Sequence, residues 1–418
     1  MKHALAGFFF LAFFFFAHTI FASPTRVCQT CKKRTIGEAI RQAQPGDEIL
    51  IAKGVYYEKG LIIDKALTLR GEEGAVIDGS GKGDKTILRV EANKVTIENI
   101  IFRNVTKNHV KDLAALKVHK ARNFEILNST FENVFFGIMI EKSKKGRIEG
   151  NRVSSKAISQ GNSGNGIHVW HSSKIDIRKN EVWGVRDGIY LEFVKKSKII
   201  DNKSHHNLRY GLHFMFSNHD EYIGNEFYKN GAGVAVMFSK FILMRKNYFH
   251  DNWGSASYGL LLKEIYDADI EYNVFERNTI AINTEGSTRI NARNNRFLAN
   301  GWALKVAGAC YKNIYTKNDF IRNSFDLSYN SKLNDNLFLG NYWGSYTGYD
   351  LDRDGVGDVD HRPVKLFSYI VNKTPESIVL LRSLFVDIIN FSEKVSPVFT
   401  PDEIVDSKPA MRENNAKL

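Results

Sequence analysis

Two side chains that can bind metals lie two positions apart in the stretch RYGLHFMFSNH, residues 209–219: those of His213 and Met215. Thioether and imidazole groups are soft or borderline ligands that suit copper. Met and His are also ordinary packing residues of protein interiors. Their role therefore depends on whether each side chain faces the core or the outer surface, and the fold decides this.

An asparagine recurs along the chain from about residue 100 to residue 345, with a second asparagine five positions later. The clearest copies begin at Asn202, Asn225, Asn247, Asn273, Asn295 and Asn318, with spacings of 23, 22, 26, 22 and 23 residues. This period is typical of a solenoid. We expect the asparagines to stack at a tight corner, because Asn tolerates the left-handed backbone conformation and its amide can bond to the Asn one coil above.

A glycine followed by alternating residues forms a second repeated element. It begins at Gly166, Gly188, Gly211, Gly233 and Gly259, with spacings that match those of the asparagines. The period of two predicts a strand. The first and third residues after each glycine are apolar, so we expect them to face the interior. Together the two elements predict an all-β fold, a right-handed parallel β-helix with about 22–23 residues per coil.

The second and fourth residues after each glycine must then face outward. One outward column contains His168, Tyr190, His213, Ala235 and Leu261, and the other contains Trp170, Glu192, Met215, Met237 and Lys263. Because neighbouring coils stack about 4.8 Å apart, Met215 and Met237 should be adjacent, with His213 beside them. Thioethers and imidazole suit Cu(I), so His213, Met215, Met237 and His168 are the copper candidates. The alternative is an apolar patch that packs against a loop or a partner.

Other residues of the repeats suggest different chemistry. Parallel β-helices host many polysaccharide lyases and hydrolases, and hydrolysis needs paired carboxylates across a groove. Glu192 and Asp187 are the nearest approach to such a pair. We expect a second histidine group, His205, His206 and His250, to be solvated on the surface. Phe216 is expected to belong to the apolar wall with Leu212 and Phe214.

An acidic loop, DLDRDGVGD, occupies residues 350–358. Asp350, Asp352 and Asp354 followed by glycine match the first half of an EF-hand-type calcium loop, and Asp358 could compensate for the missing glutamate at the twelfth position. A turn held by its own side-chain hydrogen bonds is the alternative.

The N-terminus has the features of a secretory signal peptide over residues 1–22, with Lys2 before an apolar run. The rest of the chain is expected to be exported and water-soluble. Cys28 and Cys31 form a CxxC pair, which predicts a local disulfide in an oxidising compartment or, alternatively, a metal-capturing pair. With 58 basic and 46 acidic residues the net charge is +12. This favours an acidic partner or an anionic membrane face, and no motif indicates nucleic acid.

The two ends of the solenoid are expected to be capped. The sequence TIGE, residues 35–38, is a capping box that predicts a short helix through Gln44. Residues 375–394 have helical apolar spacing. From about Ser407 the chain is polar and is expected to be poorly ordered. The expected organisation is a signal peptide at 1–22, an N-terminal segment with its helix at 23–47, the β-helix at 48–348, an Asp-rich loop and closing strand at 349–374, and a C-terminal helix and partner-docking tail at 375–418.

Three stretches resemble the NosD family of nitrous oxide reductase maturation proteins: LRYGLHFMFSN; NYWGSYTGYDLDRDGVGD with RPV after it; and LLRSLFVDIINFSEKVSPVFTPDEIVD. The resemblance covers nearly the whole mature chain, and His213 and Met215 lie inside it. It implies a periplasmic accessory protein without turnover of its own. The implied partners are the permease and ATPase of an ABC transporter, a copper-chaperone lipoprotein and the apo reductase. It also implies that the helix from Pro375 and the segment TPDEIVDSKPAMR dock onto the periplasmic face of the permease.

The sequence therefore favours an accessory protein that binds or hands over copper, Cu(I), while the copper centres of nitrous oxide reductase are assembled. It would be peripheral to the inner membrane through its partners, and Ca²⁺ in the acidic loop is a further possibility. An exported polysaccharide lyase or hydrolase and a metal-free docking scaffold are the two alternatives.

Overall fold

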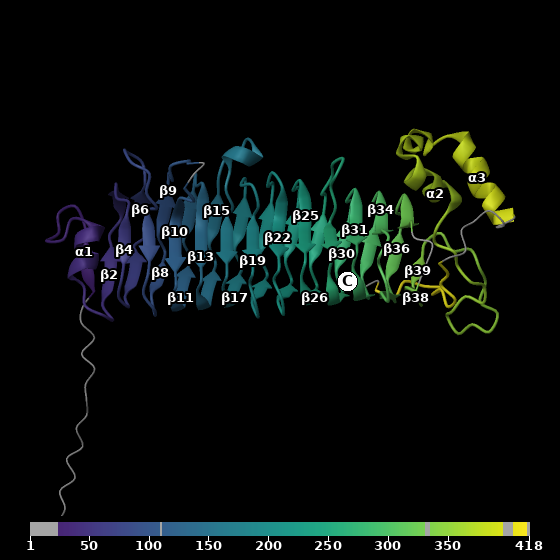
Figure 1. Cartoon of the computed structure of the whole chain (residues 1–418), viewed down its shortest axis with the longest axis horizontal. Coiled ribbons are helices and arrows are strands. Elements are labelled where there is room, and N and C mark those ends of the chain that lie inside the picture. Colours follow the sequence, from purple (N-terminus) through teal and green to yellow (C-terminus); the bar gives the residue numbers. More distant parts are fainter. Residues whose placement is uncertain (1–23, 109–110, 331–334, 396–403, 416–418) are drawn as a thin grey trace, which may run out of the picture.

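Parallel strands dominate the computed structural model, which describes residues 24–108, 111–330, 335–395 and 404–415. The strands wind into a right-handed solenoid of about 14 coils, and the predicted fold class is confirmed. Figure 1 shows the coils stacked along one axis, with few helices. The predicted signal peptide, residues 1–22, lies outside the described residues. No described helix is long and apolar enough to cross a membrane.

Most coils contribute one strand to each of three parallel sheets, here called A, B and C. Within the described residues, sheet A has 14 strands: β1 Thr25–Val27, β2 Glu48–Ile51, β5 Thr68–Gly71, β8 Thr96–Glu98, β11 Arg122–Leu127, β14 Lys144–Glu149, β17 Ser173–Arg178, β20 Lys198–Ile200, β23 Glu221–Ile223, β26 Lys240–Arg245, β29 Tyr266–Glu271, β32 Thr288–Arg293, β35 Ile314–Thr316 and β38 Leu337–Leu339.

Sheet B follows sheet A along each coil and contains the strands that come after the leading asparagines. Its 13 described strands are β3 Gly54–Tyr56, β6 Ala75–Asp78, β9 Ile101–Arg103, β12 Thr130–Glu132, β15 Arg152–Ser154, β18 Glu181–Trp183, β21 Lys203–His205, β24 Glu226–Tyr228, β27 Tyr248–His250, β30 Val274–Glu276, β33 Arg296–Leu298, β36 Asp319–Ile321 and β39 Tyr342–Trp343.

Sheet C contains the strands that follow the repeated glycines. In the part of the chain that is described it has 12 strands: β4 Leu61–Ile63, β7 Leu88–Val90, β10 Ala114–His119, β13 Phe136–Glu141, β16 Ile167–Trp170, β19 Ile189–Glu192, β22 Tyr210–Met215, β25 Ala232–Met237, β28 Leu260–Lys263, β31 Ile280–Glu285, β34 Trp302–Val306 and β37 Phe325–Tyr329.

The core fills the inside of the coils. The first and third residues after the repeated glycines are all buried, as their apolar character predicts: Ile167, Val169, Ile189, Leu191, Leu212, Phe214, Val234, Val236, Leu260 and Leu262. From sheet B, the rings of Phe227, Phe249, Phe275, Phe297 and Phe320 stack on one another, with centroids 4.6–5.5 Å apart. Such continuous burial of apolar surface is the main favourable term in folding.

The predicted asparagine ladder is present, with one correction. The backbone N–H and the side-chain amide of Asn273 both donate to the Oδ1 atom of Asn295, at 2.9 and 3.0 Å, and the same pair of bonds repeats between successive leading asparagines. The left-handed residue is not the asparagine itself but the residue before it, such as Tyr272 and Asn294 with φ near 55°. The asparagine comes directly after the bend, and its hydrogen bonds link the bend to the next coil.

At the N-terminal end, α1 (Ile36–Gln42) packs its buried residues Ile36, Ala39 and Ile40 over the first coil (Figure 1). The Thr35 hydroxyl accepts a hydrogen bond from the backbone N–H of Glu38, which is the expected N-cap. The helix ends before the predicted Gln44. Strand β1 pairs in parallel with β2, so sheet A begins inside the segment that was expected to precede the β-helix.

Short helices close the C-terminal side, and here the sequence prediction was partly wrong. No closing strand follows the acidic loop among the described residues; instead α2 (Leu366–Lys373) forms. The helix expected over 375–394 is divided into a 3₁₀ turn, η2 (Pro375–Leu380), and α3 (Leu384–Val395). A further 3₁₀ turn, η1 (Gln160–Asn162), lies in a loop between sheets B and C. The rings of Phe325 and Phe367 pack between the last coils and α2.

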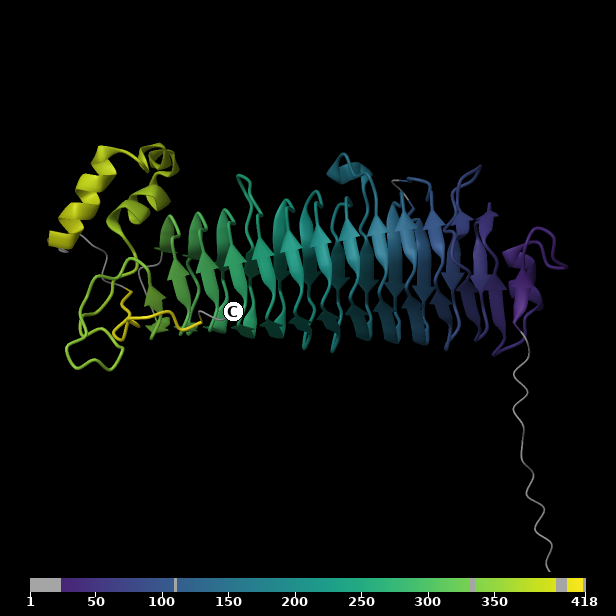
Figure 2. The ribbon, with the colours of Figure 1, turned by 180° about the vertical axis from the view of Figure 1, so that it is seen from behind.

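Residues 404–415 return to the solenoid, whereas the chain from about Ser407 was expected to be poorly ordered. Asp406 bridges in parallel to Phe338 of β38, and Ala410 bridges in parallel to Tyr342 of β39. The residues therefore continue sheets A and B for one more step. Figure 2 shows the terminal segment running along the last coils from behind. The backbone N–H groups of Asn414 and Asn415 donate to the Asp319 carboxylate, both at 2.8 Å.

Candidate metal centre

Met215 and Met237 are direct register partners on the outer face of sheet C, in neighbouring strands β22 and β25. Both side chains are half-buried and point away from the core. The Tyr190 hydroxyl donates to the Met215 Sδ atom at 3.9 Å. The strand register thus brings two thioethers together one coil apart, as expected from the spacing of the glycines.

His213 also lies in an outward column, but the side chains of Arg209 and Tyr210, at the start of β22, lie against it, and it is only 5% exposed. The Arg209 Nη2 atom lies 3.4 Å from the His213 Nδ1 atom, and the Tyr210 ring is centred 4.8 Å from the imidazole. The His213 Nε2 atom is buried and has no hydrogen-bond partner. Burial lowers the pKa of His213 to about 4, although the Asp187 carboxylate opposes the shift. The imidazole is therefore neutral at pH 7, as a metal ligand must be.

His168 lies two coils from His213 in the same column, with Tyr190 between them. The Tyr190 ring is centred 4.8 Å from His168 and 4.9 Å from His213. Burial also lowers the pKa of His168 to about 4. The structure brings His213 into the neighbourhood of the methionine pair but does not bring His168 there, because two further coils correspond to about 10 Å.

Asp187, which was considered with Glu192 as a pair of carboxylates for hydrolysis, has a different role. Asp187 is fully buried, and its two oxygens accept hydrogen bonds from Arg209 at 2.8 and 2.5 Å. Arg186 lies 3.6 Å away. Glu192 itself lies close to Tyr190. The pKa of Tyr190 is raised to about 12, mainly by burial and next by the charge of Glu192. Asp187 is thus occupied in positioning Arg209 over His213, which reasoning from the repeats alone had missed.

Phe216 does not belong to the apolar wall as expected. It lies at a corner with φ of 50°, is 38% exposed and stacks with Phe193 and Phe238 at 5.1 Å on either side. The alternation of the strand ends at Met215, and the chain bends at the next residue. The corner therefore places an exposed aromatic ladder directly beside the methionine pair.

The second histidine group is more ordered than expected. His205 and His250 occupy the same column on sheet B with Tyr228 between them, and the rings stack at 4.6 and 4.8 Å. Their side chains are only 12% and 13% exposed, so they are not solvated, whereas His206 is exposed. Burial is the main cause that lowers the pKa of His205.

In the acidic loop, oxygens of Asp350, Asp352 and Asp354 lie within 4.8 Å of one another, a grouping that could hold a metal ion. Asp358 is not part of this group, and its carboxylate accepts a hydrogen bond from the backbone N–H of Leu351 at 2.7 Å. The backbone N–H groups of Asp354 and Gly355 donate to Asp350, at 3.2 and 3.0 Å, as in a self-supporting turn. Calcium binding by this loop stays a prediction.

Cys28 and Cys31 form a disulfide, as their expected export favours. Cys310 is free and buried among the described residues. Neither thiol chemistry nor a cysteine ligand is therefore available at the methionine pair.

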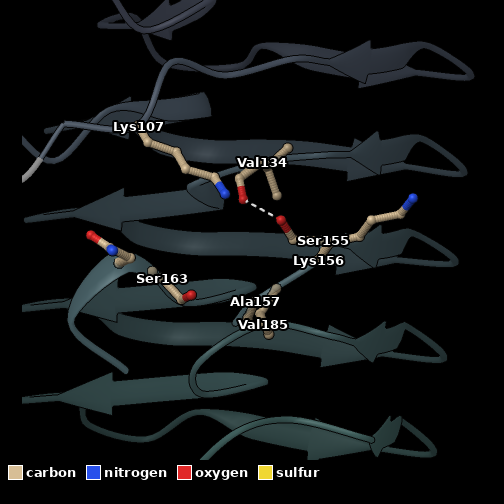
Figure 3. Close-up of a pocket in the computed structure, with 9 residues that line it drawn as sticks. Lys107, Val134, Ser155, Lys156, Ala157, Ser163 and Val185 are labelled. Atoms are coloured by element: carbon tan, nitrogen blue, oxygen red, sulfur yellow. Dashed lines mark hydrogen bonds between the residues drawn. The ribbon is translucent and has the colours of Figure 1, made fainter. Parts of the chain in front are cut away.

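Two pockets lie away from the candidate ligands. Figure 3 shows one beneath the loop that carries η1, where Ser155 donates to the carbonyl of Val134 at 2.8 Å. The other, a cavity of about 1020 Å³, lies between the last coil and helices α2 and α3. Asp326 lines this cavity, and burial raises its pKa to about 6. Neither pocket is lined by a predicted copper ligand.

Comparison with solved structures identifies the fold class of the protein. The A-module of mannuronan C-5 epimerase AlgE6 from Azotobacter vinelandii is similar, with a TM-score of 0.61 and 12% identity, covering 73% of this chain and 92% of that one. PfbA, a surface adhesin of Streptococcus pneumoniae, has a TM-score of 0.50 and 14% identity, covering 66% and 86%. At such low identity these matches show the parallel β-helix fold alone.

Sequence comparison is more specific. The family model described as "Periplasmic copper-binding protein (NosD)" matches residues 153–348. A probable ABC transporter binding protein NosD from Pseudomonas aeruginosa is 27% identical over 405 residues, covering 85% of this chain and 86% of the relative. A protein of the same name from Stutzerimonas stutzeri is 24% identical over 412 residues, covering 87% and 86%. The chain is thus similar in sequence to proteins of the NosD family over most of its length.

Proposed function

We propose that this chain is a periplasmic accessory protein that binds Cu(I), or hands it over, while the copper centres of nitrous oxide reductase are assembled together with an ABC transporter. The family description as periplasmic and copper-binding supports the ion and the compartment. The names of the two relatives support the association with a transporter. The remaining proposed partners are a copper-chaperone lipoprotein and the apo reductase.

The observation that carries the proposal is the register of Met215 with Met237 on the outer face of sheet C. Two thioethers one coil apart, with the neutral His213 imidazole beside them, form a soft ligand set that suits Cu(I) in low coordination number. Arg209 donates toward Nδ1 of His213, so Nε2 carries the proton in the resting protein. Copper could bind Nε2 of His213 only after this proton had moved to another atom. The methionines are therefore the primary ligands, and His213 becomes a ligand only after that proton transfer.

The docking part of the proposal rests on helix α3 and the turn before it. Their exposed apolar side chains form a surface here called the α3 face: Ile378, Val379, Leu384, Phe385, Ile388 and Phe391. Large exposed apolar surfaces are rare on monomeric soluble proteins and often mark interaction sites. Residues 404–415, which were expected to dock as well, are engaged with the solenoid, so docking onto the permease is assigned to the α3 face.

Titration with Cu(I) against a chromophoric chelator tests the ligand assignment. The double variant Met215→Leu/Met237→Leu removes both sulfur atoms but nearly keeps the side-chain volumes. We expect its affinity for Cu(I) to fall by at least about tenfold, which corresponds to about 1.4 kcal/mol. Met139→Leu is the control, because this buried thioether of β13 lies opposite His168, away from the methionine pair. The same number of bound Cu(I) ions and the same affinity in the wild type and the double variant would refute the assignment.

The enzyme alternative is favoured by no specific observation on the outer face of sheet C. Asp187 is paired with Arg209, so the pair Asp187 and Glu192 does not offer two free carboxylates for hydrolysis. Cleavage of any member of a glycan panel that is lost in Glu192→Gln would favour it instead. A metal-free scaffold would bind the transporter but show no difference between the wild type and the Met215→Leu/Met237→Leu variant in the titration.

A further inference from the structure

A pair of histidine nitrogens faces each other at the corner that follows β21, on a different side of the coil from the methionine pair. The Nδ1 atoms of His205 and His206 lie 2.8 Å apart, with the two rings nearly perpendicular. His205 ends β21 of sheet B, and His206 is the left-handed corner residue with φ of 53°. The bend of the chain therefore turns two adjacent side chains toward one another.

A carboxylate fixes which nitrogen of His205 carries the proton. The His205 Nε2 atom lies 3.4 Å from the Oε1 atom of Glu181, one coil below. A carboxylate only accepts hydrogen bonds, so Nε2 of His205 is protonated and Nδ1 presents its lone pair to His206. In metal sites, carboxylates hold the outer nitrogen of a ligating histidine in this way.

We infer that His205 and His206 form a second Cu(I) site, in which the two Nδ1 atoms bind one ion in a nearly linear arrangement. In the resting protein the proton between the two nitrogens resides on His206. A shift of the His206 ring to its Nε2–H form, which water can accept at this exposed position, leaves two lone pairs facing each other. Imidazole nitrogen and low coordination number both suit Cu(I), and no net proton release is needed.

The distances fit this arrangement with a small movement. Imidazole nitrogens bind first-row metal ions at about 2 Å, so a linear site needs the two Nδ1 atoms about 4 Å apart. The required opening of about 1 Å falls on His206, which is exposed. His205 is held between the rings of Trp183 and Tyr228, at 5.8 and 4.6 Å, and stays in place as the fixed ligand.

His250 provides a comparison within the same column. Its Nε2 atom lies 3.1 Å from Glu226 and its Nδ1 atom 2.8 Å from Asp251. Both nitrogens thus face carboxylates rather than the nitrogen of a second imidazole. The two histidines share stacking, exposure and sheet position, so they differ mainly in the partner of Nδ1.

The test uses the full mature chain carrying Met215→Leu/Met237→Leu, so that copper at the methionine pair does not contribute. Cu(I) is titrated against a chelator in this background, with His206→Gln and, as matched control, His250→Gln added separately. We expect one bound equivalent that His206→Gln weakens by at least about tenfold and His250→Gln leaves unchanged. X-ray absorption should show a two-coordinate ion with nitrogen ligands only.

The outcomes separate this inference from the proposed function. Equal copper binding with and without His206→Gln, or sulfur in the X-ray absorption spectrum, would overturn it. An unchanged number of bound Cu(I) ions and an unchanged affinity in Met215→Leu/Met237→Leu, relative to the wild type, would refute the methionine site while leaving the histidine site intact. Because His206 is exposed at a corner, His206→Gln should not change the thermal unfolding midpoint, and this is checked in parallel.

Discussion

Asp406 takes the position of the next asparagine beyond Asn341, where the repeat itself has ended. Its Oδ2 atom accepts hydrogen bonds from the backbone N–H and the side-chain amide of Asn341, at 3.0 and 2.9 Å. These are the two bonds that each leading asparagine makes to its neighbour. The same oxygen accepts from the Trp343 indole at 3.0 Å, and Oδ1 accepts from the backbone of Gly340.

Replacing this carboxylate should loosen the C-terminal end of the solenoid. Asp406→Ala leaves the buried donors of Asn341 and Trp343 without an acceptor, and each such loss costs about 1–3 kcal/mol. We expect a lower thermal midpoint and faster proteolysis after the last coil, measured by circular dichroism and limited digestion. Asp112→Ala, at an exposed position, is the control. Unchanged digestion of Asp406→Ala would contradict the capping role.

The asparagine ladder should be as sensitive in the middle as at its end. Asn273 is fully buried; it donates to Asn295 and to the Met244 carbonyl and accepts from Asn247. Asn273→Ala removes these bonds and strands polar groups inside the coil, so we expect a loss of about 3 kcal/mol or more of unfolding free energy. Denaturant unfolding measures it, and the exposed Asn162→Ala should lie within error of the wild type.

Asp220 makes stability depend on pH. It is fully buried, its Oδ2 atom has no hydrogen-bond partner, and burial raises its pKa from 3.8 to about 7 while a bond from the Ser197 backbone opposes the shift. The folded protein keeps this proton at pH values where the unfolded chain releases it. Stability is therefore fully present below about pH 4 and is lost as the pH rises toward 7, by about 4 kcal/mol in total.

The variant Asp220→Asn removes this titration. It should match the wild type near pH 4 and unfold at a higher temperature at pH 8, because an amide carries no charge to bury. Thermal unfolding at pH 4, 6 and 8 measures the difference, with the exposed Asp112→Asn as control. A gain that is the same at all three pH values would show that Asp220 is not the titrating group.

The α3 face should matter for binding and not for folding. Phe385→Ser/Phe391→Ser removes two exposed rings, so we expect an unchanged thermal midpoint but loss of co-purification with the transporter from membranes. Ile158→Ser is the matched control, because Ile158 is an exposed apolar residue on the distant loop that carries η1. Retained co-purification of the double variant would remove the α3 face from the proposed function.

The repeats made the fold predictable because each of them shows the same requirement, that its apolar residues face the interior. The alternation after Gly211 and Gly233 places Leu212 and Val234 inside, and their spacing fixes the register of Met215 with Met237. Sheet register is set by such hydrophobic patterns, since a slip of one residue would expose every inward side chain. Facing and neighbours within sheet C therefore followed from the sequence.

Features that occur only once were not predictable in the same way. The burial of His213 depends on contacts with the side chains of Arg209 and Tyr210, at the start of β22, which the alternation of the strand does not indicate. The position of Asp406 depends on a strand pairing between residues more than 60 positions apart. Phe216 continues an apolar run, yet the chain has already bent. Corners and ends are set by tertiary contacts that a local pattern does not contain.

The hydrogen bonds between the leading asparagines have a common direction, and this explains why an aspartate follows the last asparagine. The bonds between leading asparagines all point the same way along the axis, because the backbone N–H and the side-chain amide of each one donate to the asparagine on its C-terminal side. The amide also donates back to a backbone carbonyl on the N-terminal side, as Asn318 does to Ala292. The last unit, Asn341, is therefore left with two outward donors. A further asparagine would accept them but would present new donors of its own, whereas a carboxylate accepts and donates nothing. Asp406 thus ends the asparagine ladder. If repeats were added to lengthen the solenoid, this aspartate would have to be placed after the last of them.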